Sequence, residues 1–330
     1  MQCRKTQSLI YLLPLAALLV VGCASSQSTS GATGPNESVQ LTEQRWGSSG
    51  TVLKTAHFTL YTTMNDPDFN QRLAQVMEGA LTQYRRLAPT AKIDPRPMDC
   101  YIFANRRQWA EFTRQRTGND AAIYLQINRG GYTVRDFFVA YYIGESGTFA
   151  VAAHEGWHQF VARHFKDRLP PFLEEGIATT FENISWDSNL PRWNMLRNVS
   201  RSQKLRDAIE KNSLWSLPQL VSMHAGDVVG EPAEKIEAFY AQNWAFARFL
   251  TDGAGGRYRA ALNRMLADAV AGTLAHSIGG PKRIDGSFNP RAVRPMLEHY
   301  LGTTLEEVDS AYQAYIRELA KNAVDEHAQD

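Results

Sequence analysis

The sequence has few cysteines, almost no net charge, and none of the residue bias that marks a fibrous or disordered chain. Its 330 residues include 3 Cys, too few for a small scaffold held together by disulfides. The 35 Lys and Arg nearly balance the 34 Asp and Glu, so we expect no nucleic-acid partner. The 23 Gly follow no three-residue period, which excludes collagen, and a hydrophobic content of 44% excludes a disordered chain. The length is sufficient for one large domain or two ordinary ones.

Three motifs that identify common enzyme classes are also missing. The sequence contains no Walker loop, no Rossmann fingerprint and no Gly-x-Ser-x-Gly elbow. Any catalytic signal must therefore come from another arrangement of residues.

The first 22 residues are predicted to be a targeting segment. Arg4 and Lys5 precede an apolar run over residues 9–21 that is too short to span a bilayer comfortably. The string Leu19-Val20-Val21-Gly22-Cys23 resembles the lipobox of bacterial lipoproteins. This resemblance implies cleavage before Cys23 and lipidation of its thiol, which would make the membrane a partner of the protein. An ordinary secretory signal with a chance Cys is the alternative.

The same resemblance implies a location and a tether. A lipoprotein of this kind is anchored in the bacterial cell envelope and faces an extracytoplasmic space. Ala24 follows the Cys instead of Asp, which in a Gram-negative cell implies the periplasmic side of the outer membrane. Residues 23–50 are predicted to be the lipidated Cys and a flexible linker, since residues 24–38 are Ser, Thr, Gly, Ala and Pro with few bulky side chains.

Residues 51–330 are predicted to form one catalytic unit of the α+β class. A strand or a hairpin is expected at 52–62, and strands are expected at 99–104, 122–128 and 132–142, with a hairpin turn at 129–131. Helices are expected at 68–87, 106–116, 149–165 and 172–182. Beyond 183 the chain is expected to be wholly helical, with loops at 183–194, 222–235 and 278–290. Strands followed by helices predict a mixed or antiparallel N-terminal sheet with its active-site helices to about 182, and a helical lobe over 183–330.

The strongest functional signal is the string His154-Glu155-Gly156-Trp157-His158, an H-E-x-x-H motif. On a helix, residues four apart lie on one face, so His154 and His158 can point at one metal ion. Glu155 lies beside that face, where its carboxylate can take a proton from a water molecule on the metal. Two helical histidines that merely pack or face solvent are the alternative.

A zinc site requires a third protein ligand and one open position. The next predicted helix contains two candidates, Glu174 and Glu175, in the sequence Phe-Leu-Glu-Glu-Gly-Ile-Ala. Either carboxylate would complete a site with two His and one Glu. The composition of this helix does not choose between them.

H-E-x-x-H, a short loop and then this Glu-Gly-x-Ala helix resemble the gluzincin metallopeptidases, which include thermolysin and the aminopeptidase N group. The compact gluzincin-like domains of bacterial lipoproteins and secreted proteins are the most similar in character. The resemblance implies a zincin-like fold and a Zn²⁺ ion held by His154, His158 and Glu175. It also implies that Glu182 steadies a His or the ligand helix from outside the metal's coordination shell, whereas Glu174 faces solvent. An ordinary surface Glu is the alternative reading of Glu182.

Two further segments refine the comparison with this family. Residues 239–250 resemble the Tyr-bearing helix of the aminopeptidase N group, which implies that the Tyr240 hydroxyl stabilises an oxyanion. An aromatic residue on an amphipathic helix is the alternative reading of Tyr240. The Gly-x-Met-Glu-Asn strand that grips a free amine in those aminopeptidases is absent from residues 123–142. An endopeptidase is therefore favoured over an exopeptidase.

The sequence thus predicts a membrane-anchored zinc-dependent hydrolase whose substrate is a peptide or protein, with Glu155 as general base. Two alternatives remain open. One is a non-catalytic binding or assembly lipoprotein on a peptidase scaffold, and the other is a hydrolase of a non-peptide amide in the cell envelope.

Some remaining residues are expected to have structural roles only. Cys100 is expected to be buried in a strand, and His57 is not expected to bind metal. A basic helix face is expected to be solvated, and it comprises Arg197, Arg201, Lys204, Arg206 and Lys211.

Overall fold

A computed structural model of the chain describes residues 42–46, 50–128, 130–228, 231–274 and 289–327. The chain divides into two compact units, Met1–Glu37 and Ser38–Asp330, and all of the described residues belong to the second. The predicted signal peptide, Cys23 and most of the predicted linker lie outside the described residues. Within the described ranges, no helix combines the length and the apolar character needed to cross a membrane.

A mixed six-stranded sheet forms the first part of the unit, with the strand order β1-β2-β3-β4-β6-β5. Strands β3, β4 and β6 run parallel to one another, and the other neighbours are antiparallel. Strands β1 and β5 form the two edges. The strands are β1 (Thr42–Trp46), β2 (Gly50–Lys54), β3 (Phe58–Thr62), β4 (Met98–Phe103), β5 (Gly131–Val134) and β6 (Phe137–Tyr141).

Helices cover both faces of this sheet. On one face, α1 (Pro67–Leu87) and α4 (Glu145–His164) pack over the sheet in the main hydrophobic core, which includes Leu60 of β3. On the other face, α2 (Arg106–Thr117) and the single turn α3 (Ala121–Tyr124) enclose a smaller core with Trp109 and Tyr132. Because successive strand residues point to opposite faces, the neighbour of Tyr132, Thr133, lies on the α4 side.

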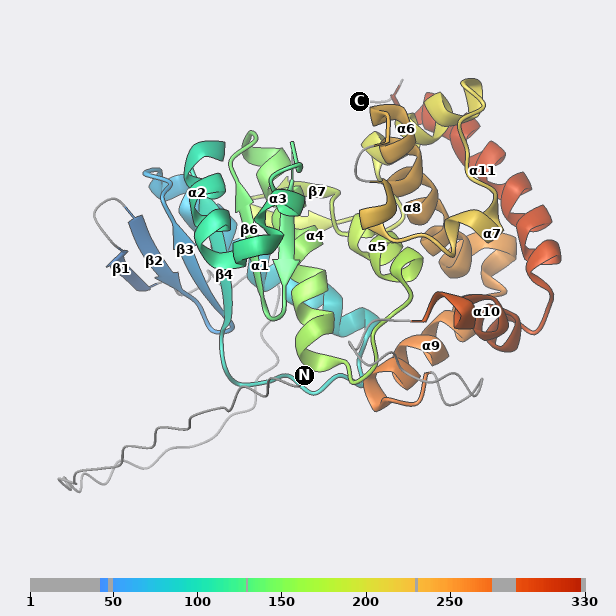
Figure 1. The fold of residues 1–330 in the computed structure, drawn as a ribbon, viewed down its shortest axis with the longest axis horizontal. Coiled ribbons are helices and arrows are strands. Elements are labelled where there is room, and N and C mark those ends of the chain that lie inside the picture. Colours follow the sequence, from blue (N-terminus) through green and yellow to red (C-terminus); the bar gives the residue numbers. More distant parts are fainter. Residues whose placement is uncertain (1–41, 47–49, 129, 229–230, 275–288, 328–330) are drawn as a thin grey trace, which may run out of the picture. The chain divides into compact units, whose positions relative to one another are not determined.

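The second part of the unit is mainly helical. Figure 1 shows α6 to α11 gathered away from the sheet, with α4 and α5 between the two groups. The helices are α5 (Pro171–Thr180), α6 (Val199–Glu210), α7 (Leu217–Leu220), α8 (Ala233–Gly256), α9 (Arg259–Ala271), α10 (Val293–Leu301) and α11 (Leu305–His327). The described residues also include short 3₁₀ turns at Gly118–Asp120, Ala225–Val228 and Pro290–Ala292. The α+β class predicted from the sequence is confirmed.

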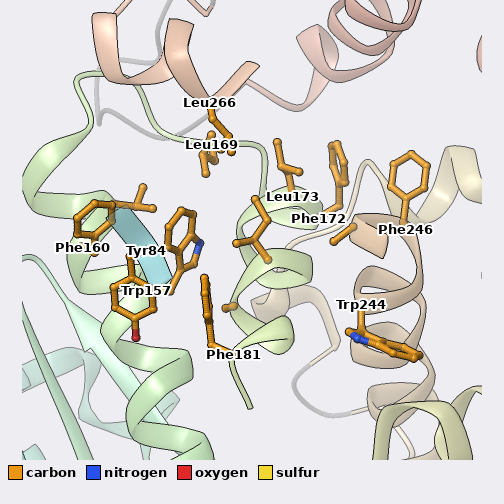
Figure 2. Close-up of a cluster of buried hydrophobic side chains, with 14 of the residues drawn as sticks. Tyr84, Trp157, Phe160, Leu169, Phe172, Leu173, Phe181, Trp244, Phe246 and Leu266 are labelled. Carbon is orange, nitrogen blue, oxygen red and sulfur yellow. The ribbon is translucent and has the colours of Figure 1, made fainter. Parts of the chain in front are cut away.

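One continuous core joins the sheet and its helices to the helical lobe. Figure 2 shows Phe172 and Leu173 of α5 between Trp157 of α4 and Phe246 of α8. All four side chains are almost completely excluded from solvent. At about 1.5–3 kcal/mol for burying a large apolar side chain, this shared core holds α5 firmly between α4 and α8.

The predicted hairpin near residue 130 is wrong in its position. The predicted strand 122–128 contains α3 and a turn, since Leu125 N donates to Ala121 O as in a helix. The predicted strand 132–142 is itself the hairpin, formed by β5 and β6. Its turn lies at Arg135 and Asp136, and Arg135 adopts a left-handed conformation with φ 55. The apolar residues on both sides of this turn read as one strand because the turn has no Gly, Pro or Asn.

The expectation of a wholly helical chain beyond 183 is also wrong. Strands β7 (Ile184–Asp187) and β8 (Leu190–Trp193) form a hairpin in the predicted loop 183–194. Its two turn residues, Ser188 and Asn189, both have positive φ, as a two-residue hairpin turn requires. The Trp193 indole donates to Phe181 O, so this hairpin packs onto the end of α5.

The sheet also begins earlier in the chain than predicted. Strand β1 lies within residues 23–50, which the sequence predicted to be a linker, and it pairs antiparallel with β2. Its polar sequence, TEQRW, carries no apolar alternation that would have identified a strand.

Candidate metal centre

Helix α4 carries His154, Glu155 and His158, and close packing against α1 fixes its position. The Tyr84 hydroxyl of α1 donates to Ala153 O at 2.5 Å. A Cβ atom at Gly156 would lie 2.7 Å from that hydroxyl oxygen, so the two helices can approach this closely only because residue 156 is Gly. Packing against α1 therefore holds the part of α4 that carries the motif rigidly in the core.

Three ligand atoms from α4 and α5 converge at one point. His154 Nε2 lies 3.2 Å from His158 Nε2 and 3.3 Å from Glu175 Oε2. His158 Nε2 lies 3.6 Å from the same Glu175 oxygen. The three side chains are largely buried, with relative exposures of 11%, 14% and 14% for His154, His158 and Glu175. This group could hold a metal ion.

The other ring nitrogen of each histidine contacts a carboxylate. His154 Nδ1 lies 3.0 Å from Glu182 Oε1, and His158 Nδ1 lies 3.0 Å from Glu174 Oε1. The prediction that Glu174 faces solvent is wrong, because its side chain is only 13% exposed. The two nitrogens of one imidazole point in different directions, so adjacent carboxylates on α5 reach different sides of the His158 ring.

Glu182 is itself held by α6. Asn198, the N-cap of α6, donates through Nδ2 to Glu182 Oε2 at 3.0 Å. Arg201 donates through Nε to Oε2 at 2.9 Å and through Nη2 to Oε1 at 2.7 Å. The prediction of a solvated basic helix face is therefore wrong for Arg201, whose side chain is 20% exposed. A bidentate hydrogen bond to the Glu182 carboxylate holds this guanidinium inside the protein.

Charge and burial shift the pKa values of both histidines, of Glu175 and of Glu182. Burial alone would lower the pKa of His154, but hydrogen bonds with Glu175 and Glu182 outweigh it and raise the pKa to about 9. Burial opposes protonation of His158 as well, yet Glu175 and Glu174 raise its pKa well above the usual value. Burial would raise the pKa of Glu175, but the two histidines hold it below its usual range. Despite burial, Arg201 and His154 lower the pKa of Glu182 to about 2.

The geometry of the three converging atoms fits a divalent cation. A carboxylate at Nδ1 places the ring proton there and turns the lone pair of Nε2 toward the facing ligand atoms. Glu175 Oε2 is buried, and in the described part of the chain it faces the two Nε2 atoms as ion-pair contacts at 3.3 and 3.6 Å. Ligand atoms at about 2.0–2.1 Å from a tetrahedral zinc ion lie about 3.3 Å from one another, close to the separations found here. The donor set of two imidazoles and one carboxylate is also one that zinc accepts.

Tyr240 lies beside the same group of atoms. Its ring centroid is 6.4 Å from that of His154, and the Arg201 guanidinium lies 5.2 Å above the Tyr240 ring. Helix α8 comes this close to α5 because residue 176 is Gly, where a Cβ atom would lie 2.4 Å from Asn243 O. Burial and the Glu175 charge raise the pKa of Tyr240 well above its usual value, so its hydroxyl remains a neutral hydrogen-bond donor.

Glu155 is held by the sheet. Thr133 of the edge strand β5 donates its hydroxyl to Glu155 Oε2 at 2.7 Å. Of the residues that the sequence predicted at the site, the structure brings together His154, His158, Glu175, Glu182 and Tyr240. Glu155 follows His154 on α4, and its charge acts on Tyr240.

Comparison with known proteins gives no family for this chain. No protein-family model matches it, and no curated protein matches it significantly. The functional argument therefore rests on the arrangement of side chains.

Four residues of the site were not predicted in the roles that they have, namely Thr133, Glu174, Asn198 and Arg201. Glu174 was a candidate ligand that the resemblance placed in solvent, and Arg201 was assigned to a solvated face. Only Glu174 lies next to a predicted ligand, and the adjacent pair of carboxylates was a usable signal. The other three come from β5 and α6, and no local spacing connects those elements to the motif on α4.

The remaining predictions concern residues away from the site. His57 does not join the metal-binding group, since its Nδ1 lies 2.8 Å from Glu78 Oε2. Cys100 is fully buried in β4, as predicted.

Proposed function

We propose that this protein is a zinc-dependent hydrolase with a zincin-like fold, and that it acts on peptide bonds as an endopeptidase. The observation that carries the proposal is the convergence of His154 Nε2, His158 Nε2 and Glu175 Oε2 beside Glu155. A site that served only to hold structure together would have no use for an adjacent carboxylate that is free to take a proton.

A zinc ion held by His154, His158 and Glu175 would polarise the scissile carbonyl and lower the pKa of a water molecule to near neutrality. The surrounding side chains transfer the proton, stabilise the developing charge and orient the histidines. Glu155 accepts the proton of the attacking water and passes it to the departing amine. Tyr240, as a neutral donor, hydrogen-bonds the carbonyl oxygen as negative charge develops on it. Glu182 and Glu174 hold the two imidazole rings in orientation through Nδ1.

The proposal includes a location for this chemistry. The lipobox-like string ending at Cys23 supports anchorage in a bacterial cell envelope through a lipidated thiol. The substrate would then be a peptide or protein of the extracytoplasmic space.

Replacing Glu155 by Gln separates chemistry from metal binding. The full-length protein and the Glu155→Gln variant should bind equal amounts of zinc. Only the wild type should cleave a mixture of quenched fluorescent peptides blocked at both ends, with a loss of about 10²- to 10⁴-fold in the variant. Glu111→Gln, on the exposed side of α2, serves as the matched control.

Other outcomes of this experiment would favour a different function or contradict the mechanism. Cleavage of peptides with a free amino end, and none of blocked peptides, would make the enzyme an exopeptidase. Zinc in both proteins with cleavage in neither would favour a binding lipoprotein or a hydrolase of another amide. Full activity in Glu155→Gln would contradict the mechanism.

A further inference from the structure

The edge strand β5 makes an unusually close approach to the helix that carries the motif. A Cβ atom at Gly131 would lie 2.9 Å from Val139 O and 3.1 Å from both Glu155 Cγ and Val151 Cγ1. Only a residue without a side chain fits there, so Gly131 lets the strand lie directly against the Glu155 side chain.

Two residues further on, the strand presents a hydroxyl to the same carboxylate. Thr133 is paired with Phe138 of β6, and strand alternation places its side chain on the α4 side of the sheet. Its Oγ1 lies 2.7 Å from Glu155 Oε2 and 3.1 Å from Glu155 O. A hydroxyl has one proton, and the shorter contact to the charged oxygen is the stronger hydrogen bond.

The two oxygens of Glu155 are therefore not equivalent. Oε2 is held by Thr133, whereas Oε1 makes no hydrogen bond with any residue that the structure describes. Glu155 is only 8% exposed, so few other groups can compete for its carboxylate. One oxygen is fixed in direction and the other is left to accept a proton.

We propose that Thr133 is a positioning residue that orients the general base, by binding Glu155 Oε2 so that Oε1 is the oxygen that takes the proton from water. The catalytic part of this inference rests on the proposed function. The orientation of the Glu155 carboxylate rests on the strand geometry alone. Thr133 acts through Glu155 and needs no contact with the substrate.

The test compares Thr133→Val, which removes the hydroxyl and keeps the shape, with Thr133→Ser, which keeps the hydroxyl. Valine is well accepted in strands, so both variants should fold. Thr117→Val, which removes a hydroxyl bonded to Thr113 O at the end of α2, is the matched control. All variants are made in the full-length, zinc-loaded protein and checked for zinc content and thermal unfolding.

The first measurement is independent of activity. Infrared difference spectra against Glu155→Gln isolate the carboxylate stretching band of Glu155. That band should shift in Thr133→Val, because one carboxylate oxygen loses its hydrogen bond, and it should return in Thr133→Ser. An unchanged band in a folded Thr133→Val protein would overturn the inference.

The second measurement is steady-state hydrolysis of the quenched peptides. Thr133→Val should lower kcat about 10- to 100-fold with KM within about twofold, and Thr133→Ser should recover most of the loss. A shift of the infrared band with kcat unaltered would show that the orientation has no catalytic role and would overturn the proposal. If the wild type hydrolyses no peptide, the proposed function fails while the infrared result still decides the orientation of Glu155.

Discussion

Arg201 binds both oxygens of Glu182, at 2.7 Å from Oε1 and 2.9 Å from Oε2, and Glu182 Oε1 is also 3.0 Å from His154 Nδ1. A single carboxylate thus connects α6 to a histidine of the candidate metal site. Because the planar guanidinium makes two parallel hydrogen bonds to the planar carboxylate, Arg201 sets the orientation of Glu182. The helical lobe therefore takes part in positioning His154.

Arg201→Gln should weaken zinc binding by about 10- to 100-fold, since Glu182 would lose its fixed orientation and its compensating charge. The zinc affinity of Arg201→Lys should lie between that of this variant and that of the wild type, because Lys keeps the positive charge but cannot bind both carboxylate oxygens in the same way. Competition with a chromophoric chelator measures the zinc Kd. Lys204→Gln on the same helix, which removes only a more exposed ion pair with Glu237, is the control. Equal zinc affinity in Arg201→Gln and wild type would contradict this account.

Glu174→Gln should also weaken zinc binding, by about tenfold, because an amide is a poorer acceptor for His158 Nδ1 than a carboxylate. Glu175→Gln should lose more zinc affinity, since Glu175 would supply a ligand atom itself. The same chelator competition measures both variants, and Glu111→Gln on α2 shows the effect of removing an exposed charge. If Glu174→Gln behaved like that exposed variant, the contact with His158 would have no bearing on the site.

Zinc binding should strengthen as the pH rises. The pKa of His154 is raised to about 9 and that of His158 is raised well above its usual value, so both rings are protonated at neutral pH when no metal competes. Zinc binds neutral imidazole, so binding must release these protons, and the apparent affinity should increase from about pH 6 to about pH 9. Glu175 releases none, because its pKa lies below its usual range. Titration calorimetry in two buffers of different ionisation enthalpy counts the protons, and a count near zero would show that the rings are already neutral.

Gly176→Ala should destabilise the fold and disturb the site together. A Cβ atom there would lie 2.4 Å from Asn243 O and 3.1 Å from Ala247 Cβ, and the backbone oxygen cannot move without shifting α8. We expect a loss of about 1–3 kcal/mol in the free energy of unfolding, measured by denaturant titration. Gly226→Ala, where a Cβ atom would meet nothing within 4 Å, is the matched control. Equal stability of the two variants would show that α5 and α8 are not in close contact at Gly176.

The core of the site could be predicted because it follows local periodicity. His154 and His158 are one helical turn apart, so spacing alone brought these two residues into consideration. The pair Glu174 and Glu175 on the next helix offered a third ligand. The choice of Glu175 and the role of Glu182, which lies just beyond the end of α5, came from the resemblance to the gluzincins. Thr133 and Arg201 could not be found in this way. Their contacts depend on how β5 and α6 pack against α4 and α5, which no short stretch of sequence encodes.

The fold was predicted best where elements are long. Helix α1 was expected at 68–87 and spans Pro67–Leu87, because its apolar residues recur at helical spacing and Asp66 caps its start. The hairpins β5–β6 and β7–β8 were missed because each of their strands has only 4 or 5 residues. Strands of that length carry too few alternations to be distinguished from loops or from longer strands.

The most direct test of the account is the coordination of zinc in the purified full-length protein, measured by X-ray absorption and by metal content. The account predicts one zinc per chain, bound to two imidazole nitrogens and to carboxylate or water oxygens at about 2.0–2.2 Å. It also predicts that zinc is lost from His154→Ala and retained in Glu155→Gln. A chain that takes up no zinc, or that retains it unchanged in His154→Ala, would contradict the assignment of His154, His158 and Glu175 as the metal site.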